Sequence, residues 1–264
     1  MWQGARSEST GLESSEVPSY AVVAVYPEIV DTALAAGVVG RARSSNRWRF
    51  QSISLRTEAE RLGVRLDTRP RGGGPGMLLR PDVLDAAIAR AEQWHGRRAK
   101  RVVLSADGAP LKQKTVETLS RERALTIIAG RYEGFDDHWL RHCGAELVSI
   151  GDFVLSGGEL AAAVLLDAIV RILPGVLGDA ESAELDSFST GLLDYPNFAS
   201  EGAEQAATAL ERFSGNHSAI ARWRRLQALL RTLERRPDVL AQARLTAADR
   251  SALRAALARG SDSV

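Results

Sequence analysis

Apolar and polar positions alternate in blocks along the first two thirds of the chain. Short apolar or alternating runs predict strands at residues 20–26, 46–55, 101–104, 124–129 and 147–150. Apolar positions at helical spacing predict helices at residues 28–40, 81–95, 114–122 and 160–173. Strands that alternate with helices predict an α/β fold with a mostly parallel sheet.

Turn-forming residues interrupt this pattern at several places. The strand at 101–104 is expected to break at residues 105–108, whose sequence is Ser-Ala-Asp-Gly. Residues 56–69 are charged and fit neither the helical nor the strand period. Residues 69–77 read RPRGGGPGM, and so many Gly and Pro residues predict a loop.

The chain is predicted to contain two domains and two less ordered segments. Residues 1–19 are polar and rich in Ser and Glu, which predicts disorder. The α/β domain is expected over residues 20–178, followed by a linker at 179–211 that is rich in Asp, Ser, Gly and Ala. A small helical domain is expected over residues 212–264, with breaks near Arg236–Pro237 and Thr246.

Composition narrows the class of protein. Hydrophobic residues make up 45% of the 264 positions and charged residues 25%, as in ordinary globular proteins. No apolar run approaches the roughly 20 residues that span a bilayer, and the first residues lack the apolar core of a secretory signal. The single cysteine, Cys143, excludes an internal disulfide and suits a reducing compartment. We therefore expect a cytoplasmic protein that does not act in a membrane.

Charge is distributed unevenly. The net charge of the chain is only +1, but residues 211–264 contain eleven Arg against five Asp and Glu. A basic segment attached to a nearly neutral body favours a local anionic partner, of which nucleic acid is the obvious example. The alternative is that Arg is simply the usual cation of this chain, which has only three Lys residues.

Two glycine-bounded turns are the most informative feature of the sequence. Residues 130–136 read GRYEGFD and residues 149–159 read SIGDFVLSGGE, and each turn follows an apolar run. Glycine lets the backbone approach a ligand closely because no Cβ intervenes. The turns therefore predict a pocket made largely of main chain, although each glycine could equally serve a tight turn and Phe153 could be a core residue.

A possible metal site lies beside the first turn. His138 and His142 are four residues apart on a predicted helix, next to Cys143. This spacing suits zinc, but no glutamate occupies the HExxH position and Cys143 lies off the His face. Exposed helix residues are the favoured interpretation, and no protein-bound metal is predicted.

Seven ordered sequence blocks give the chain a family resemblance. From about residue 20 to residue 240 it resembles the bacterial TrmD family, the SPOUT-class tRNA (guanine-N1)-methyltransferases that modify position 37 beside the anticodon. The matching blocks are RPRGGGPGM (69–77), LSADG (104–108), GRYEGFD (130–136), SIGDFVLSGGE (149–159), RILPGVLG (171–178), DSFSTGLLDYP (186–196) and SGNHSAIARWR (214–224).

The resemblance implies a deeply knotted α/β domain, with a trefoil knot, that binds S-adenosyl-L-methionine and works as a homodimer. It also implies tRNA as the partner and makes Mg2+ possible. The donor-binding residues that it implies are Leu104, Ser105, Gly130, Tyr132, Glu133, Gly134, Ile150, Gly151, Phe153, Leu155, Gly157 and Gly158.

Asp186 and Arg171 are the catalytic pair that the resemblance implies. Methylation requires deprotonation of guanine N1, and a carboxylate can accept that proton as a general base. A guanidinium can stabilise the negative charge that develops on O6. Without the resemblance, Asp186 would be interpreted as a helix N-cap and Arg171 as a surface residue.

Departures from the family pattern cluster in the blocks expected to meet the acceptor. The typical loop VDDRPYGGGPGM has Thr68 in place of an acid and Arg71 in place of an aromatic residue. The PRDF-like block is replaced at residues 54–58, Thr-Arg-Pro is replaced at residues 199–201, and the lead-in at 209–213 is altered. On the donor side only Ala106 and Phe153 differ, and both changes are mild.

The main functional hypothesis is methylation of N1 of guanine 37 in tRNA, and a methyltransferase acting on another RNA or a small nitrogen heterocycle is the alternative. A non-catalytic donor-binding or RNA-binding regulator is less expected, because both catalytic side chains are present.

Overall fold

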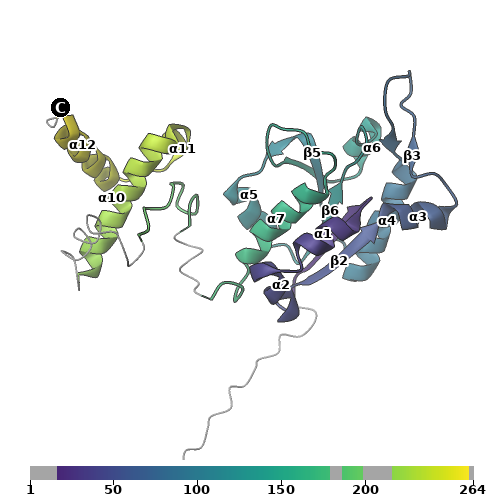
Figure 1. Cartoon of the computed structure of the whole chain (residues 1–264), viewed down its shortest axis with the longest axis horizontal. Coiled ribbons are helices and arrows are strands. Elements are labelled where there is room, and N and C mark those ends of the chain that lie inside the picture. The colour runs from purple at the N-terminus through teal and green to yellow at the C-terminus, as the bar shows by residue number, and fades with distance from the viewer. Residues whose placement is uncertain (1–16, 179–185, 199–215, 262–264) are drawn as a thin grey trace, which may run out of the picture. The chain divides into compact units, whose positions relative to one another are not determined.

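The computed structural model describes residues 17–178, 186–198 and 216–261 (Figure 1). The chain divides into two compact units, Met1–Gly178 and Asp179–Val264. Most of the segment expected to be disordered, and parts of the expected linker and C-terminal domain, lie outside the described residues. The domain boundaries therefore stay a prediction.

A five-stranded parallel sheet forms the centre of the first unit. Its order is β2-β1-β6-β5-β7, with every neighbouring pair parallel. The strands are β1 (Ser19–Ala24), β2 (Arg49–Ser54), β5 (Lys100–Pro110), β6 (Ala124–Ala129) and β7 (Glu146–Ser149). The predicted α/β fold with a parallel sheet is confirmed.

Helices cover both faces of this sheet (Figure 1). One face packs against α1 (Pro27–Ala33), α2 (Gly37–Ser44), α5 (Gln113–Leu119) and α7 (Glu159–Arg171). The other face packs against α3 (Leu55–Leu62), α4 (Pro81–His95) and α6 (Asp137–His142). In β1, Val22 belongs to the first core and Val23 to the second, because successive side chains point to opposite faces. Burial on both faces explains why the central strands are continuously apolar.

Two sequence predictions within this unit are wrong. The single helix expected at residues 28–40 is two helices, α1 and α2, and the second begins at Gly37 with a φ of 69°, a conformation that glycine adopts readily. The strand expected to stop at residue 104 continues to Pro110 through an irregularity between Leu104 and Ala109. Gly108 permits this, because a Cβ there would lie 2.5 Å from the backbone nitrogen of Val148.

The charged region that fitted neither period contains α3 and the first strand of a small hairpin. Strands β3 (Asp67–Thr68) and β4 (Leu78–Leu79) pair antiparallel, and the Gly-rich loop at 69–77 joins them as predicted. The hairpin projects from the first unit in Figure 1.

Helices α10 (His217–Arg235), α11 (Pro237–Gln242) and α12 (Ala247–Ser261) belong to the second unit. They pack with the segment 186–198, whose Leu192 is 1% exposed beside Leu229 of α10. The backbone N–H of Leu193 also donates to Thr232 Oγ1 at 2.9 Å. Among the described helices of both units, none has the length and apolar character that crossing a lipid bilayer requires.

Candidate functional site

The two glycine-bounded turns meet at the carboxyl ends of the parallel strands. Leu104 of β5 pairs with Ala129 of β6 on one side and with Val148 of β7 on the other. The N–H of Gly158 donates to the carbonyl of Gly130 at 2.8 Å, which joins the turn after β7 to the turn after β6. The expected donor-binding residues of the three segments are therefore neighbours in the fold. Carboxyl ends of parallel strands are the usual place for ligand sites.

The contact between the turns depends on the absence of a side chain. A Cβ on Gly158 would lie 2.9 Å from both Ala129 Cα and Gly130 N, which are backbone atoms that cannot move aside cheaply. Gly158 is also the N-cap of α7, so the same close approach fixes where that helix begins. This explains why the block that precedes α7 ends in a glycine at position 158.

The hairpin loop at 69–77 joins the same site. The N–H of Glu133 donates to the Met77 carbonyl at 2.9 Å, and the N–H of Leu79 donates to the Gly134 carbonyl at 3.0 Å. Tyr132, which lies between the end of β6 and Glu133 along the chain, has a φ of 60°. This conformation is uncommon for a residue with a side chain. Backbone bonds on both sides hold the turn in this conformation, in agreement with a rigid binding loop.

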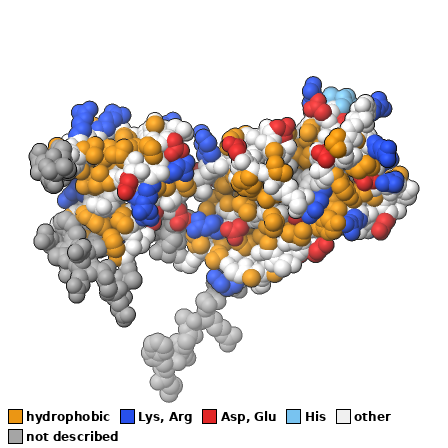
Figure 2. Space-filling view, turned by 45° about the horizontal axis from the view of Figure 1, so that its top comes forward, with side chains coloured by type: hydrophobic (Ala, Val, Ile, Leu, Met, Phe, Trp, Pro, Cys, Tyr) orange, Lys and Arg blue, Asp and Glu red, His pale blue; other side chains and the backbone are white. Residues whose placement is uncertain are grey.

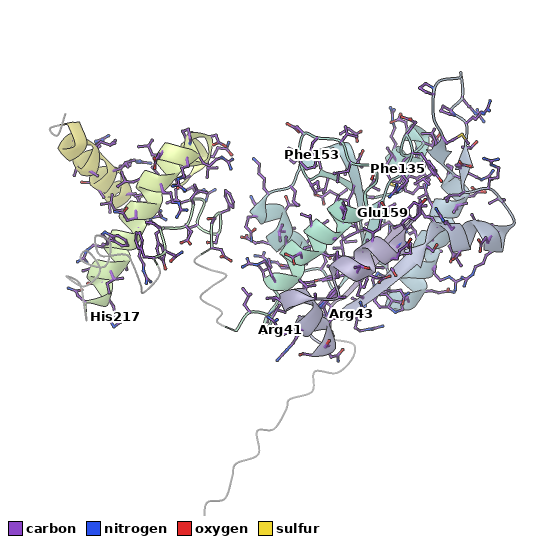
Figure 3. The ribbon with its side chains drawn as sticks, viewed as in Figure 1. Arg41, Arg43, Phe135, Phe153, Glu159 and His217 are labelled. Atoms are coloured by element: carbon purple, nitrogen blue, oxygen red, sulfur yellow. The ribbon has the colours of Figure 1, made fainter. Side chains whose placement is uncertain are left out.

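Aromatic and apolar side chains of the turns remain accessible. Tyr132 is 50% exposed, Phe153 is 56% exposed and Leu155 is 38% exposed. In Figure 3, Phe153 lies on the loop at the top of the first unit and Glu159 lies below it near the centre. The alternative interpretation of Phe153 as a core residue is therefore wrong, and its ring is available to a ligand.

A buried ion pair beneath the turns was not found by sequence reasoning. Glu159 is 1% exposed, and its carboxylate accepts from Arg131 Nε at 3.3 Å and from the Tyr26 N–H at 3.2 Å. The Arg131 guanidinium also lies 4.5 Å from the centre of the Tyr26 ring. Glu159 directly follows Gly158 at the start of α7, and an acid in the first turn of a helix was the available signal.

The two expected catalytic residues are described in separate units. Arg171 is the last residue of α7, and Asp186 opens the described part of the second unit. Both residues already make interactions within the chain. The carbonyl of Asp186 accepts from Ser189 Oγ at 2.7 Å. Their joint action stays a prediction.

His138 and His142 lie together on the exposed side of α6. Their ring centres are 4.3 Å apart, and His142 Nδ1 donates to the His138 carbonyl at 2.7 Å. Cys143 is buried, with its Sγ 3.3 Å from the Leu140 carbonyl. Across the described residues, no group of three or more His, Cys, Asp or Glu could hold a metal ion. The possible use of Mg2+ is not tested by this observation.

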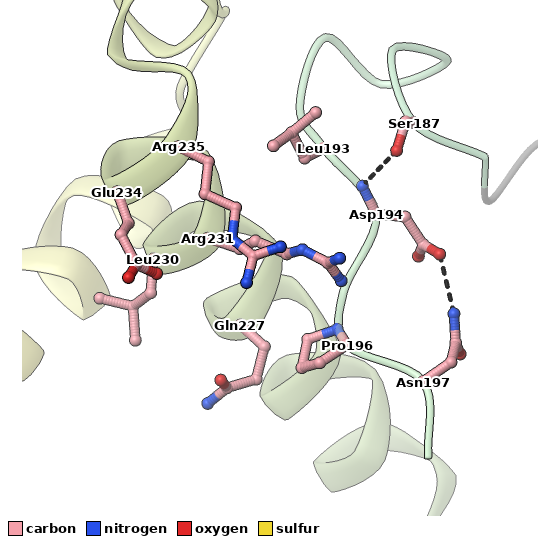
Figure 4. Close-up of a pocket in the computed structure, with 10 residues that line it drawn as sticks. All are labelled: Ser187, Leu193, Asp194, Pro196, Asn197, Gln227, Leu230, Arg231, Glu234 and Arg235. Carbon is pink, nitrogen blue, oxygen red and sulfur yellow. Dashed lines mark hydrogen bonds between the residues drawn. The ribbon is translucent and has the colours of Figure 1, made fainter. Parts of the chain in front are cut away.

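The second unit contains a hollow of about 560 Å³ between the segment 186–198 and α10 (Figure 4). Arg231 and Arg235, one helical turn apart, line it together with Ser187 and Asp194. Ser187 Oγ accepts from the Asp194 N–H at 2.9 Å, so the polar segment after Asp186 is internally braced. Sequence reasoning noticed the basic character of this region but not the hollow.

Comparison with known proteins identifies the family of the chain. Residues 19–242 match the family described as tRNA (Guanine-1)-methyltransferase TrmD. The tRNA (guanine-N(1)-)-methyltransferase of Neisseria gonorrhoeae (strain NCCP11945) is 46% identical over 220 residues, which cover 83% of this chain and 88% of that protein. The proteins of the same name from Dechloromonas aromatica (strain RCB) and Magnetococcus marinus (strain ATCC BAA-1437 / JCM 17883 / MC-1) are 45% and 40% identical, over 85% and 89% of this chain and 91% and 94% of their own lengths.

Proposed function

Because the chain belongs to the TrmD family of tRNA (guanine-1)-methyltransferases, we propose that it is a cytoplasmic enzyme that methylates N1 of guanine 37 in tRNA, with S-adenosylmethionine as the donor. The observation that carries this proposal is the family match over residues 19–242, which includes both glycine turns and the segment with Asp186. The relatives named above carry tRNA (guanine-N1) methylation in their names and align over most of their own lengths.

The glycine turns fit the donor. Three chain segments meet through backbone hydrogen bonds at Gly130, Gly134 and Gly158. Main-chain N–H and C=O groups can pair with the edge of an adenine, and the exposed Phe153 ring can cover its face. When bound, S-adenosylmethionine supplies an electrophilic methyl group on a sulfonium centre.

The acceptor chemistry is assigned to Asp186 and Arg171. Guanine N1 carries a proton at neutral pH, and its lone pair becomes available only when that proton leaves. The Asp186 carboxylate would accept the proton from N1 as general base. The Arg171 guanidinium would stabilise the negative charge that then appears on O6. Both roles require the guanine to be held in place, so alignment of the two reactants contributes a large share of the acceleration.

The same proposal includes a trefoil knot and a homodimer. The bond between Gly158 N and Gly130 O brings the segment after β7 against the turn after β6, which is the region where the family resemblance implies threading. Exposed apolar side chains support a second copy of the chain as partner. Those on the segment 153–155 and on one face of α7 are Phe153, Val154, Leu155, Leu160 and Val164.

A methylation assay tests the proposed function. Purified protein is incubated with methyl-labelled S-adenosylmethionine and an unmodified tRNA transcript that has guanine at position 37. We expect one methyl group per tRNA, found as 1-methylguanine after digestion, and none in a transcript with adenine at position 37. Label on a different nucleotide, or on small molecules from a cell extract but not on tRNA, would instead support the alternative acceptors. No transfer to guanine 37 under any condition would overturn the proposal.

A further inference from the structure

A hollow of about 400 Å³ lies against the β3–β4 hairpin and is lined by an unusual set of charges. The polar residues that line it are Thr68, Arg69, Arg71, Arg80, Asp82 and Asp136. Figure 2 shows Lys and Arg side chains, with a few acidic ones, at the end of the first unit that carries β3 and α3. Three guanidinium groups and two carboxylates surround this hollow, so an anionic ligand depends on which of these charges are already paired.

The two carboxylates of the hollow are already engaged. Arg80 holds Asp82 in a two-pronged contact, with Nε to Oδ1 at 3.0 Å and Nη2 to Oδ2 at 2.7 Å. The side chain of Asp136 accepts from the Trp139 N–H at 2.9 Å and so caps α6. The Arg80 pair compensates the charge of Asp82, whereas the hydrogen bond from Trp139 engages one oxygen of Asp136 without compensating its charge.

The guanidinium groups of Arg69 and Arg71 have no such compensation. Neither residue forms an ion pair or hydrogen bond with any residue of the described ranges, and both are exposed. Thr68, the last residue of β3, lines the same hollow and contributes a neutral hydroxyl. The hollow therefore presents two guanidinium groups without ion-pair partners among the described residues, and one hydroxyl donor, against the single uncompensated carboxylate of Asp136. The excess of positive charge suits a phosphate oxygen cluster.

The hollow adjoins the glycine turns. Asp136 is the last residue of the turn 130–136, and the hairpin strand that carries Leu79 is bonded to Gly134. An anion bound here would thus lie beside the proposed methylation site. Because the proposed acceptor is a tRNA, the anion expected beside the reacting base is a phosphodiester group of that RNA.

We propose that Arg69, Arg71 and Thr68 bind a phosphodiester group of the RNA acceptor near the methylated nucleotide. This inference rests on the proposed function and names a substrate-binding subsite for it. Thr68 and Arg71 are also two of the positions at which the sequence departs from the typical loop of its family, and both departures make the loop more positive. Arg69 belongs to the typical loop as well, so Thr68 and Arg71 are the part of the subsite that departs from the family pattern.

The test compares tRNA binding by the full-length protein and the double variant Arg69→Gln/Arg71→Gln. Fluorescence anisotropy measures the dissociation constant of a tRNA transcript from about 50 to about 300 mM salt. We expect the double variant to bind about tenfold more weakly at the low-salt end, and the slope of log affinity against log salt to fall by about one to two. Thr68→Asp, which adds a carboxylate among the arginines, should weaken binding in the same direction, whereas Thr68→Asn should not.

Arg98→Gln is the matched control. Arg98 is exposed and precedes the amino end of β5, whereas the glycine turns follow the carboxyl ends of the strands. This variant removes the same charge and should leave both the affinity and the salt slope unchanged. Donor affinity, measured by calorimetry, should be the same in every variant, which shows that the first unit is folded.

Outcomes for the subsite and for the proposed function are distinguishable. If the wild type binds and methylates tRNA but the double variant has the same salt slope, the subsite is overturned and the function stands. If the wild type neither binds nor methylates tRNA, the proposed function itself fails.

A titration with inorganic phosphate, exchanged for chloride at constant ionic strength, distinguishes a phosphodiester group of RNA from free phosphate as the ligand of the subsite. Competition with tRNA that disappears in the double variant supports the subsite, and phosphate binding without any effect of the variant on tRNA overturns it.

Discussion

His95 lies buried between the amino ends of β1 and β6. Its Nδ1 is 2.8 Å from Ser19 Oγ and its Nε2 is 3.3 Å from Thr126 Oγ1. Burial, with the positive charge of Arg49 as a second cause, lowers the pKa of His95 from 6.5 to about 4. The neutral imidazole is thus part of the packed structure, and its protonation opposes folding.

The stability of the protein should therefore fall as the pH is lowered from 6.5 to about 4. Because the unfolded chain binds the proton near pH 6.5 and the folded chain only near pH 4, the stabilisation is complete above pH 6.5 and is lost progressively down to about pH 4. The loss attributable to His95 is roughly 2–3 kcal/mol. Urea unfolding followed by tryptophan fluorescence at several pH values measures it. His95→Gln should be less stable at pH 7 but flatter between pH 7 and 4.5, and an unchanged pH dependence in this variant would contradict the assignment.

Gly158 tests the contact between the glycine turns. Gly158→Ala forces a Cβ against Ala129 and Gly130, and we expect a loss of about 1–3 kcal/mol of stability together with donor binding at least tenfold weaker. Gly178→Ala is the control, since a Cβ at Gly178 meets no atom of the described residues within 4 Å. Calorimetric titration with S-adenosylmethionine and thermal unfolding give both values. Equal donor affinity in the two variants would show that donor binding does not need the close contact between the two turns.

Among the elements, α10 and α12 are joined by one well-oriented ion pair. Arg225 donates to both carboxylate oxygens of Asp249 at 2.9 and 3.0 Å, and Asp249 also accepts from the Thr246 N–H at the start of α12. The hydrogen bond from Arg225, as the largest cause, lowers the pKa of Asp249. This stabilisation is present at neutral pH and is lost as the pH falls below the ordinary range of an Asp carboxyl.

Asp249→Asn should loosen the second unit selectively. The substitution leaves Arg225 without its charged partner, and we expect roughly 1–3 kcal/mol less protection of the α10 and α12 amides in hydrogen exchange of the full chain. The first unit should be unaffected. Asp238→Asn, which removes the exposed partner of Arg236 in a pair of the same geometry, serves as the control and should change little. Equal effects of the two substitutions would mean that burial of the Asp249 pair has no energetic consequence.

The sequence predicted most elements of the sheet because burial on both faces makes a strand continuously apolar. It failed where a close contact with a distant segment decides the conformation. Gly108 continues β5 because Val148 lies against it, a fact that no local pattern contains. The candidate site shows the same contrast between local patterns and distant contacts. Its glycines could be recognised as turns from the sequence alone. The Arg131–Glu159 pair joins residues 28 positions apart and was not visible.

At the scale of the whole molecule, the first unit exposes an apolar surface that could serve the homodimer implied by the family resemblance. Figure 2 shows apolar side chains gathered over the middle of the first unit. Leu160 and Val164, one turn apart on α7, are each 52% exposed, and Val154 beside the helix start is 93% exposed. Large exposed apolar patches are usually covered by a partner, and a stable dimer needs about 800 Å² from each copy.

Val164→Glu should convert the protein to a monomer. A carboxylate at the centre of an apolar interface would lose its hydration without gaining a partner, and this cost opposes association. Sedimentation velocity should give a mass near 28.5 kDa for the variant and about twice that for the wild type. Leu62→Glu is the control, because Leu62 is 46% exposed at the end of α3, away from the α7 face. The Leu62→Glu protein should remain dimeric. If Val164→Glu keeps the mass of the wild type, α7 is not the interface. If the wild type itself sediments as a monomer, the proposed homodimer is wrong.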